Sequence, residues 1–253
     1  MYLEVAALYG YSYLAGAVPT PYLIAKLTRG IDLREYGSGN VGGSNVVRQL
    51  GKVWIVPLTL VELLLKGFSP FVLGLLVFGP PRELPLSSLC LFLASPLLAL
   101  IGNNWSPFLR FQGGRGLMVI CGIVFSLAPA LFAVGMSVYL LGWRVSRSSA
   151  VWALIATASL PVLALWPGGY LVTSWIAIWA LMGGEALQSA PSGYAAVISC
   201  YCGLILVMVL VKRGLSNSPA FPEGLSKKKV IFNRLVRDRD VDERAEWISR
   251  IPQ

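Results

Sequence analysis

The sequence predicts an all-α membrane protein: a seven-helix transmembrane bundle with its N-terminus outside and its C-terminus in the cytoplasm. Of the 253 residues, 56% are hydrophobic and only 13% are charged, whereas a soluble domain carries about 25% charged residues. The mean hydropathy is +0.68. The apolar residues also fall in long runs, and a helical span needs about 20 of them.

Eight apolar segments follow one another, separated by polar loops or by proline and glycine. Pro129 separates the fourth from the fifth, and the sequence Pro167-Gly168-Gly169 separates the sixth from the seventh. Residues 1–211 are expected to form the membrane domain, and residues 212–253 a basic cytoplasmic tail. The segments cover approximately residues 4–26, 54–79, 86–101, 117–128, 130–143, 149–166, 170–184 and 194–211.

The placement of basic residues predicts the orientation. Of the 21 Lys and Arg, ten lie at or after Lys212 and five lie within residues 26–52. Short cytoplasmic loops are rich in Lys and Arg, so loop 27–53, segment 102–116 and the tail are expected in the cytoplasm. Termini on opposite sides require an odd number of crossings. Segment 170–184, which is short and contains two tryptophans, is therefore expected not to span, or to be re-entrant.

The composition also excludes several kinds of site. The chain has no histidine, which excludes a Ser-His-Asp triad and argues against zinc. All four cysteines lie in apolar segments, where cysteine usually behaves as a small hydrophobic residue. We therefore expect no metal or other cofactor. No nucleic-acid partner is expected either, because no nucleic-acid-binding motif accompanies the basic clusters. The cysteines are Cys90, Cys121, Cys200 and Cys202.

The most informative polar stretch lies between the first two apolar segments. Glycine permits left-handed turns and close approach of a ligand, and successive amides in such a turn form a nest for an anion. An arginine fork also suits phosphate. The stretch predicts binding of a phosphorylated substrate at the membrane surface; the alternative is a flexible inter-helix loop. It reads Gly37-Ser38-Gly39-Asn40-Val41-Gly42-Gly43-Ser44-Asn45-Val46-Val47-Arg48.

A second polar stretch, residues 102–116, ends in Gly113-Gly114-Arg115-Gly116 and leads into an apolar helix. The free N–H groups and partial positive charge of a helix N-terminus favour phosphate, and Arg115 adds a full charge. The alternative is an ordinary basic turn that flanks the membrane. Two such elements on one predicted face favour an anion site.

Lys66 lies inside the second apolar segment, with Glu62 one helical turn before it. Residues four apart on a helix can pair, and ionisable residues in a membrane are costly and often functional. Gly67 and Pro70 are expected to interrupt the helix beside a polar site. The alternatives are a pair that joins helices, or a lysine that reaches the surface.

These residues resemble the motifs of a known family, the bacterial membrane acyl-phosphate:glycerol-3-phosphate acyltransferases of the PlsY type. The stretch Gly37–Gly42, with Asn45 and Arg48, resembles the first motif. Lys66-Gly67 resembles the lysine-glycine pair in the family's next helix. The second polar stretch resembles the second motif, with its two phenylalanines and three of its glycines retained. The resemblance covers about residues 10–165. It implies a seven-helix enzyme of the bacterial inner membrane with a cytoplasm-facing site.

The resemblance also implies an activity: transfer of an acyl group from acyl phosphate to the 1-hydroxyl of glycerol 3-phosphate, giving lysophosphatidic acid. Acyl phosphate is already activated, so positioning and charge stabilisation are expected to carry the reaction. The expected catalytic residues are Ser38, Arg48, Lys66 and Arg115. The expected substrate-binding residues are Gly37, Gly39, Asn40, Gly42, Asn45, Asn103, Gly113, Gly114 and Gly116.

The chain departs from the family pattern at several positions. Asn103 and Gln112 stand where the family has histidine and lysine, and Arg115 replaces another lysine. The family's third element, an arginine-histidine-arginine run followed by asparagine, has only a faint counterpart in Lys212-Arg213 and Asn217. These departures leave two alternatives open: a non-catalytic relative that binds anionic lipid or partner proteins, and a small-anion transporter. No inverted repeat supports the transporter.

The tail itself allows two interpretations. The first is a solvated, partly disordered segment. The second is an amphipathic helix at the anionic cytoplasmic leaflet, where basic residues are attracted to lipid. Its lipid-facing residues would be Val230, Ile231, Leu235 and Val236.

Overall fold

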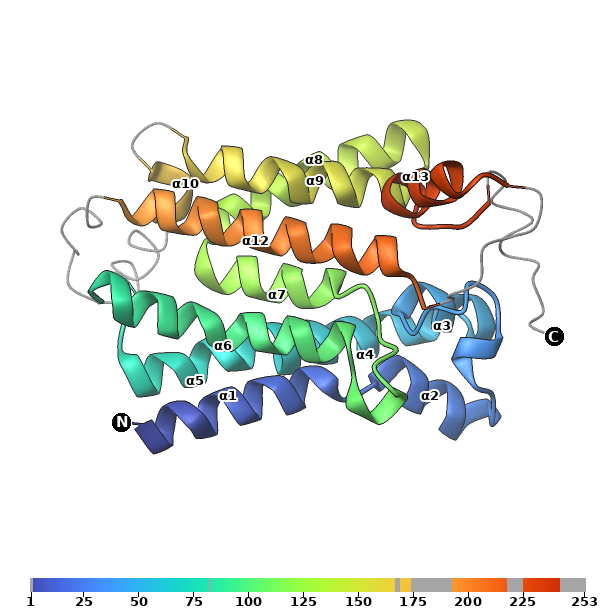
Figure 1. The fold of residues 1–253 in the computed structure, drawn as a ribbon, viewed down its shortest axis with the longest axis horizontal. Helices are drawn as coiled ribbons and strands as arrows, with labels where there is room; N and C mark the ends of the chain where they lie inside the picture. The colour runs from blue at the N-terminus through green and yellow to red at the C-terminus, as the bar shows by residue number, and fades with distance from the viewer. Residues whose placement is uncertain (1, 82, 167–168, 174–192, 218–224, 242–253) are drawn as a thin grey trace.

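In a computed structural model of the chain, the described residues are 2–81, 83–166, 169–173, 193–217 and 225–241. Every regular element in these ranges is a helix, which confirms the predicted all-α class there. The long helices run side by side along one axis (Figure 1). The elements are α1 (Tyr2–Ala17), α2 (Thr20–Arg29), η1 (Leu33–Glu35), α3 (Gly43–Leu50), η2 (Lys52–Trp54), α4 (Ile55–Leu60), η3 (Val61–Phe68), α5 (Ser69–Phe78), α6 (Leu86–Asn104), η4 (Pro107–Leu109), α7 (Leu117–Leu127), α8 (Pro129–Ser146), α9 (Ser149–Ala164), α10 (Tyr170–Thr173), α12 (Tyr194–Leu215) and α13 (Lys227–Arg237).

Four stretches of the described chain are long and apolar enough to cross a membrane. Two shorter apolar helices, α7 and α9, accompany them. The number of crossings and the orientation of the termini stay predictions. Segment 170–184 lies mostly outside the described residues, and only its first four residues are seen, as α10. The four stretches are Lys52–Phe78, Leu86–Leu109, Pro129–Ser146 and Tyr194–Leu215.

The first apolar segment, expected as one run over residues 4–26, is two helices. The chain leaves α1 after Ala17 and enters α2 at Thr20. The reason is Pro19, which lacks a backbone N–H and disfavours a helical conformation at Val18 before it. The single-segment prediction was therefore wrong at this point.

The helix around Lys66 is not interrupted as predicted. Instead, Val61–Phe68 is a π-helix within the continuous stretch Lys52–Phe78, and Pro70 lies in the first turn of α5. Gly67 serves packing: a Cβ there would lie 2.6 Å from the Cα of Gly122 in α7. Small residues at a crossing allow two membrane helices to approach closely.

Two helices run further than the sequence indicated. Helix α6 continues to Asn104, so Asn103 lies in the last turn of a helix and not in the loop. Helix α12 continues to Leu215, so the boundary drawn at residue 211 falls inside it. Lys212 and Arg213 consequently belong to the bundle.

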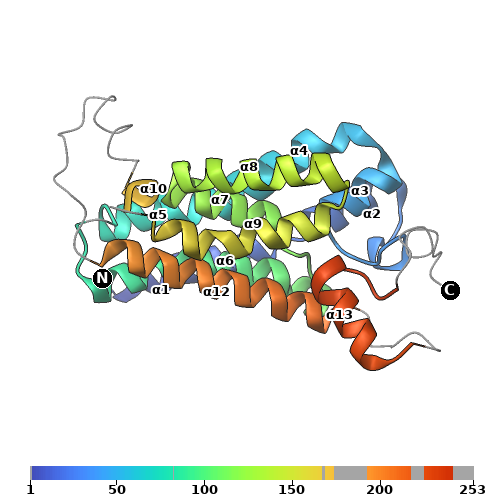
Figure 2. The same ribbon diagram turned by 90° about the horizontal axis from the view of Figure 1, so that it is seen from above.

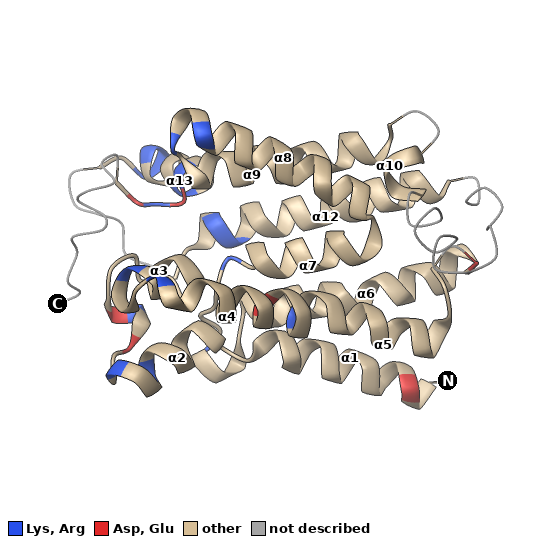
Figure 3. Ribbon diagram, turned by 180° about the vertical axis from the view of Figure 1, so that it is seen from behind, with Lys and Arg blue, Asp and Glu red and all other residues tan. Residues whose placement is uncertain are grey.

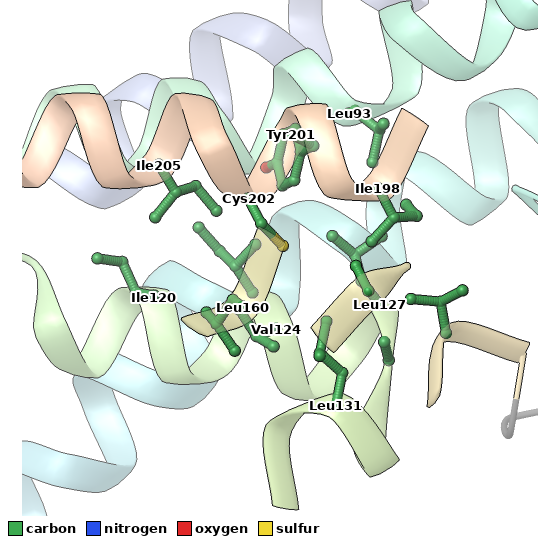
Figure 4. Packing of buried hydrophobic residues seen from close by; sticks show 14 of the residues in the cluster. Leu93, Ile120, Val124, Leu127, Leu131, Leu160, Ile198, Tyr201, Cys202 and Ile205 are labelled. Atoms are coloured by element: carbon green, nitrogen blue, oxygen red, sulfur yellow. The ribbon is translucent and has the colours of Figure 1, made fainter. Parts of the chain in front are cut away.

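The hydrophobic core joins α6, α7, α8, α9 and α12. Figure 4 shows Leu160, Ile198 and Leu131 meeting across these helices, with Cys202 among them. Cys202 is only 2% exposed, as expected of a cysteine that acts as a hydrophobic residue. This packing fixes the helix ends that carry the polar loops.

Basic residues gather at the end of the bundle that holds α2, α3 and α13, opposite the start of α1 (Figure 3). The two basic loops and the described part of the tail thus meet at one end. Helix α13 packs against α9 and α12 there (Figure 2). Val230 of α13 is buried against the protein, so its predicted contact with lipid was wrong; Ile231 and Phe232 are exposed.

Candidate functional site

The first motif is a compact loop organised by Asn45. Asn45 is fully buried, and its Nδ2 donates to the carbonyls of Leu33, Tyr36 and Asn40 at 3.1, 2.9 and 3.2 Å. Gly37 has φ +57°, and a Cβ there would lie 2.6 Å from Oδ1 of Asn45. The structure therefore places Asn45 and Gly37 inside the loop, where they shape it.

The outer surface of this loop lines a pocket of about 270 Å³. Three parts of the chain that lie far apart in sequence meet there: the first motif, the second motif, and the C-terminal segment after α12. Ser38, Gly39, Asn40 and Arg115 are the predicted site residues that the pocket contains. Its lining residues are Arg34, Ser38, Gly39, Asn40, Gln112, Arg115, Ser216, Asn217, Arg234, Asp238, Arg239 and Asp240.

Four arginines against two aspartates give the pocket lining an excess of positive charge, which favours an anionic ligand. Arg34 pairs with Asp32 through an Nη2–Oδ2 distance of 2.6 Å. The hydrogen bond from Arg34 lowers the pKa of Asp32, and the same contact raises the pKa of Arg34. Also in the lining, Arg234 Nε lies 2.5 Å from Asp240 Oδ1.

Arg115 connects the second motif to the C-terminal segment. Its Nε lies 2.9 Å from Asp238 Oδ1, and its Nη1 donates to the carbonyl of Lys212 at 2.5 Å. Lys212 Nζ donates to Asn217 Oδ1, and Asn217 Nδ2 donates to the carbonyl of Gly113, both at 3.0 Å. Lys212 and Asn217, the faint counterpart of the family's third element, are therefore connected to the second motif, and Asn217 lines the pocket. The only sequence signal for it was that faint resemblance.

The glycines of the second motif allow close packing. The N–H of Gly114 donates to the carbonyl of Asn103 at 3.0 Å, so this N–H already has a hydrogen-bond acceptor within the protein. A Cβ on Gly113 would clash with the same carbonyl oxygen. Gly116 has φ +70° and precedes the first residue of α7, a conformation that glycine adopts readily.

Lys66 forms a second centre, deeper in the bundle. Its Nζ lies 2.6 Å from Glu62 Oε1 and donates to Asn103 Oδ1 at 3.1 Å, which confirms the predicted pairing with Glu62. Lys66 is 1% exposed, so it does not reach the surface. A small cavity of about 10 Å³ touches Lys66, Asn103, Gly113 and Gly114. The second motif therefore lies between this cavity and the larger pocket.

Five predicted residues line neither cavity: Gly37, Gly42, Asn45, Arg48 and Gly116. Arg48 is exposed on α3 and is not among the residues that line the pocket. Gly42 caps the N-terminus of α3 in an extended conformation, with φ −147°. The structure thus separates the predicted site residues into a pocket set, a deeper lysine set and a set that shapes the loops.

Comparison with known proteins gives a consistent picture. The family model described as glycerol-3-phosphate acyltransferase matches residues 6–211. The chain is 32% identical over 245 residues to glycerol-3-phosphate acyltransferase 4 of Dehalococcoides mccartyi, covering 94% of this chain and 90% of that protein. It is 39% identical over 160 residues to the glycerol-3-phosphate acyltransferase of Desulforudis audaxviator, covering 63% of this chain and 76% of the relative.

The fold is also similar to a solved structure. The crystal structure of PlsY (YgiH), an integral membrane glycerol 3-phosphate acyltransferase in its glycerol 3-phosphate form, superposes with a TM-score of 0.62 and 25% identity. The superposition covers 83% of this chain and 88% of that one. The likeness to an integral membrane protein agrees with the apolar helices found here.

Proposed function

The chain belongs to the glycerol-3-phosphate acyltransferase family, and on that premise we propose that it transfers an acyl group from acyl phosphate to the 1-hydroxyl of glycerol 3-phosphate. The product would be lysophosphatidic acid, made for phospholipid synthesis at the inner membrane of a bacterium. One observation carries the proposal: the arginine-rich pocket unites Ser38 and Asn40 of the first motif with Arg115 of the second. Both proposed substrates carry a phosphate group, and arginine side chains bind phosphate through charge-assisted hydrogen bonds.

The proposed reaction needs no covalent intermediate on the enzyme. The 1-hydroxyl oxygen of glycerol 3-phosphate bonds to the acyl carbon, and the bond between that carbon and the phosphate oxygen breaks. Inorganic phosphate leaves, and the hydroxyl proton passes to a phosphate oxygen of the substrates, since the chain has no histidine. Positioning and charge stabilisation then supply the rate enhancement.

The residues divide these tasks. Ser38 and Arg115 bind substrate phosphate in the pocket, and Asn40 orients a hydroxyl. Lys66 orients Asn103 and supplies positive charge on the far side of the second motif, which favours the leaving phosphate. Arg48, which lies on α3 after the glycine-rich loop of the first motif, is a further proposed contact for acyl phosphate.

The test is direct assay of the purified protein in lipid vesicles with acyl phosphate and glycerol 3-phosphate. We expect lysophosphatidic acid and inorganic phosphate to form in equal amounts. A parallel reaction with acyl-coenzyme A identifies the donor. Product at background level from both donors, with glycerol 3-phosphate still bound, would favour the non-catalytic relative instead.

A further inference from the structure

The C-terminal segment supplies half of the pocket lining. Ser216, Asn217, Arg234, Asp238, Arg239 and Asp240 all come from it, whereas the family match ends at residue 211. The similarity to the Dehalococcoides relative covers 94% of the chain and therefore extends past that point. The segment is thus a structural part of the site.

Several contacts fix the position of Asp238. It directly follows α13, in a left-handed conformation with φ +55°, and its N–H donates to the carbonyl of Asn233. Arg213 of α12 donates from Nη1 to the carbonyl of Leu235 and from Nη2 to that of Ala150, both at 2.9 Å. Arg213 is itself 1% exposed. The end of α13 is therefore held against α12 and α9, and the Asp238 carboxylate is held with it.

Arg115 is in turn held at two of its nitrogens. Asp238 contacts Nε, and the carbonyl of Lys212 accepts from Nη1. The side chains of Arg115 and Asp238 are only 12% and 17% exposed. A guanidinium is planar, so an ion pair at one nitrogen and a hydrogen-bond acceptor at another together restrict its orientation. A fixed donor binds an anion without losing further side-chain freedom.

We propose that Asp238 is a positioning residue of this site, which holds the Arg115 guanidinium in the orientation that binds substrate phosphate. The inference rests on the proposed function, because it takes Arg115 as a phosphate ligand. Without the carboxylate, the Arg115 side chain turns and its affinity for phosphate falls, although a negative charge has left the pocket. If Asp238 merely competed with substrate for Arg115, its removal would raise the affinity.

The substitution Asp238→Asn tests this, because it keeps the side-chain shape and removes the charge. We expect the KM for glycerol 3-phosphate to rise about tenfold, the effect of losing one charge-assisted hydrogen bond between Arg115 and the substrate phosphate. The kcat and the unfolding temperature should stay near wild type. Glu83→Gln, which removes an exposed carboxylate outside the pocket lining, is the matched control. Asp238→Glu, which keeps the charge on a longer side chain, should give an intermediate KM and serves if Asp238→Asn does not fold.

A double-mutant cycle separates positioning from a structural role. In an Arg115→Gln background, Asp238→Asn should change KM no further, because Asp238 acts through Arg115. Additive losses in the cycle, a lower KM in Asp238→Asn, or a large fall in unfolding temperature in both Asp238→Asn and Asp238→Glu would each overturn the proposal. Calorimetric binding of glycerol 3-phosphate gives the same comparison without turnover. A wild-type protein that binds but makes no product would therefore refute only the proposed function.

Discussion

The two cationic centres of this protein are neutralised in different ways. Lys66 pairs with Glu62, one turn away in the same helical stretch. Arg115 pairs with Asp238, which comes from the far end of the chain and is in place only because α13 packs against α9 and α12. The first pair is thus a property of one helix, and the second is a property of the tertiary fold.

The two centres also differ in what a broken pair would cost. Lys66 is 1% exposed and Glu62 8% exposed, and a charge left alone at such depth is strongly destabilising. Arg115 lines the pocket, where an anion could exchange with or add to its partners. We infer that the deep pair maintains the bundle, in addition to the charge that Lys66 is proposed to supply for the leaving phosphate, and that the pocket pair serves binding.

The largest expected effect is on the deep pair. Lys66→Met leaves Glu62 without its counterion and should reduce the free energy of unfolding by about 3–5 kcal/mol. Chemical unfolding in detergent micelles measures it. The double variant Glu62→Gln/Lys66→Met removes both charges and should recover most of the loss. Equal losses in the single and double variants would mean that the pairing is not the cause.

Gly113→Ala changes the backbone of the second motif, which lies between the two centres. Its Cβ would clash with the carbonyl oxygen of Asn103, and overpacking of this kind should cost about 3 kcal/mol of stability. Acyl transfer should fall as well, because both cavities touch this motif. Gly203→Ala in α12 is the control, since a Cβ there meets nothing within 4 Å. A stable, active Gly113→Ala protein would contradict the close packing.

Arg115→Lys keeps the charge of the pocket centre but loses the planar fork. Affinity for glycerol 3-phosphate should weaken by about 2 kcal/mol, with a smaller change in unfolding. Titration calorimetry measures the affinity, and chemical unfolding measures the stability. Substitutions in the deep pair should show the reverse, with a larger effect on stability than on affinity. Arg48→Ala is the companion variant: because Arg48 does not line the pocket, wild-type kinetics there would remove it from the site.

The smallest effect concerns Asp32, which pairs with Arg34 at the pocket wall. Asp32→Asn should cost less than about 1 kcal/mol, because the pair is partly exposed. The folded pKa of Asp32 is lowered, so its contribution is complete above about pH 4, the ordinary aspartate value. It is lost as the pH falls through the folded pKa. Unfolding of wild type and variant should therefore differ at pH 7 and converge in acid.

The sequence alone determined the helical membrane class, because apolar runs of about 20 residues have the length of helical spans, in which every backbone group is satisfied internally. It also determined the Glu62–Lys66 pair, since residues four apart meet on any helix. Only the tertiary structure decided that Asn45 organises its loop, that the Gly114 amide is used internally, and that Asp238 reaches Arg115. Each of these contacts depends on where separate helices end and how they pack, and no local pattern of residues encodes that.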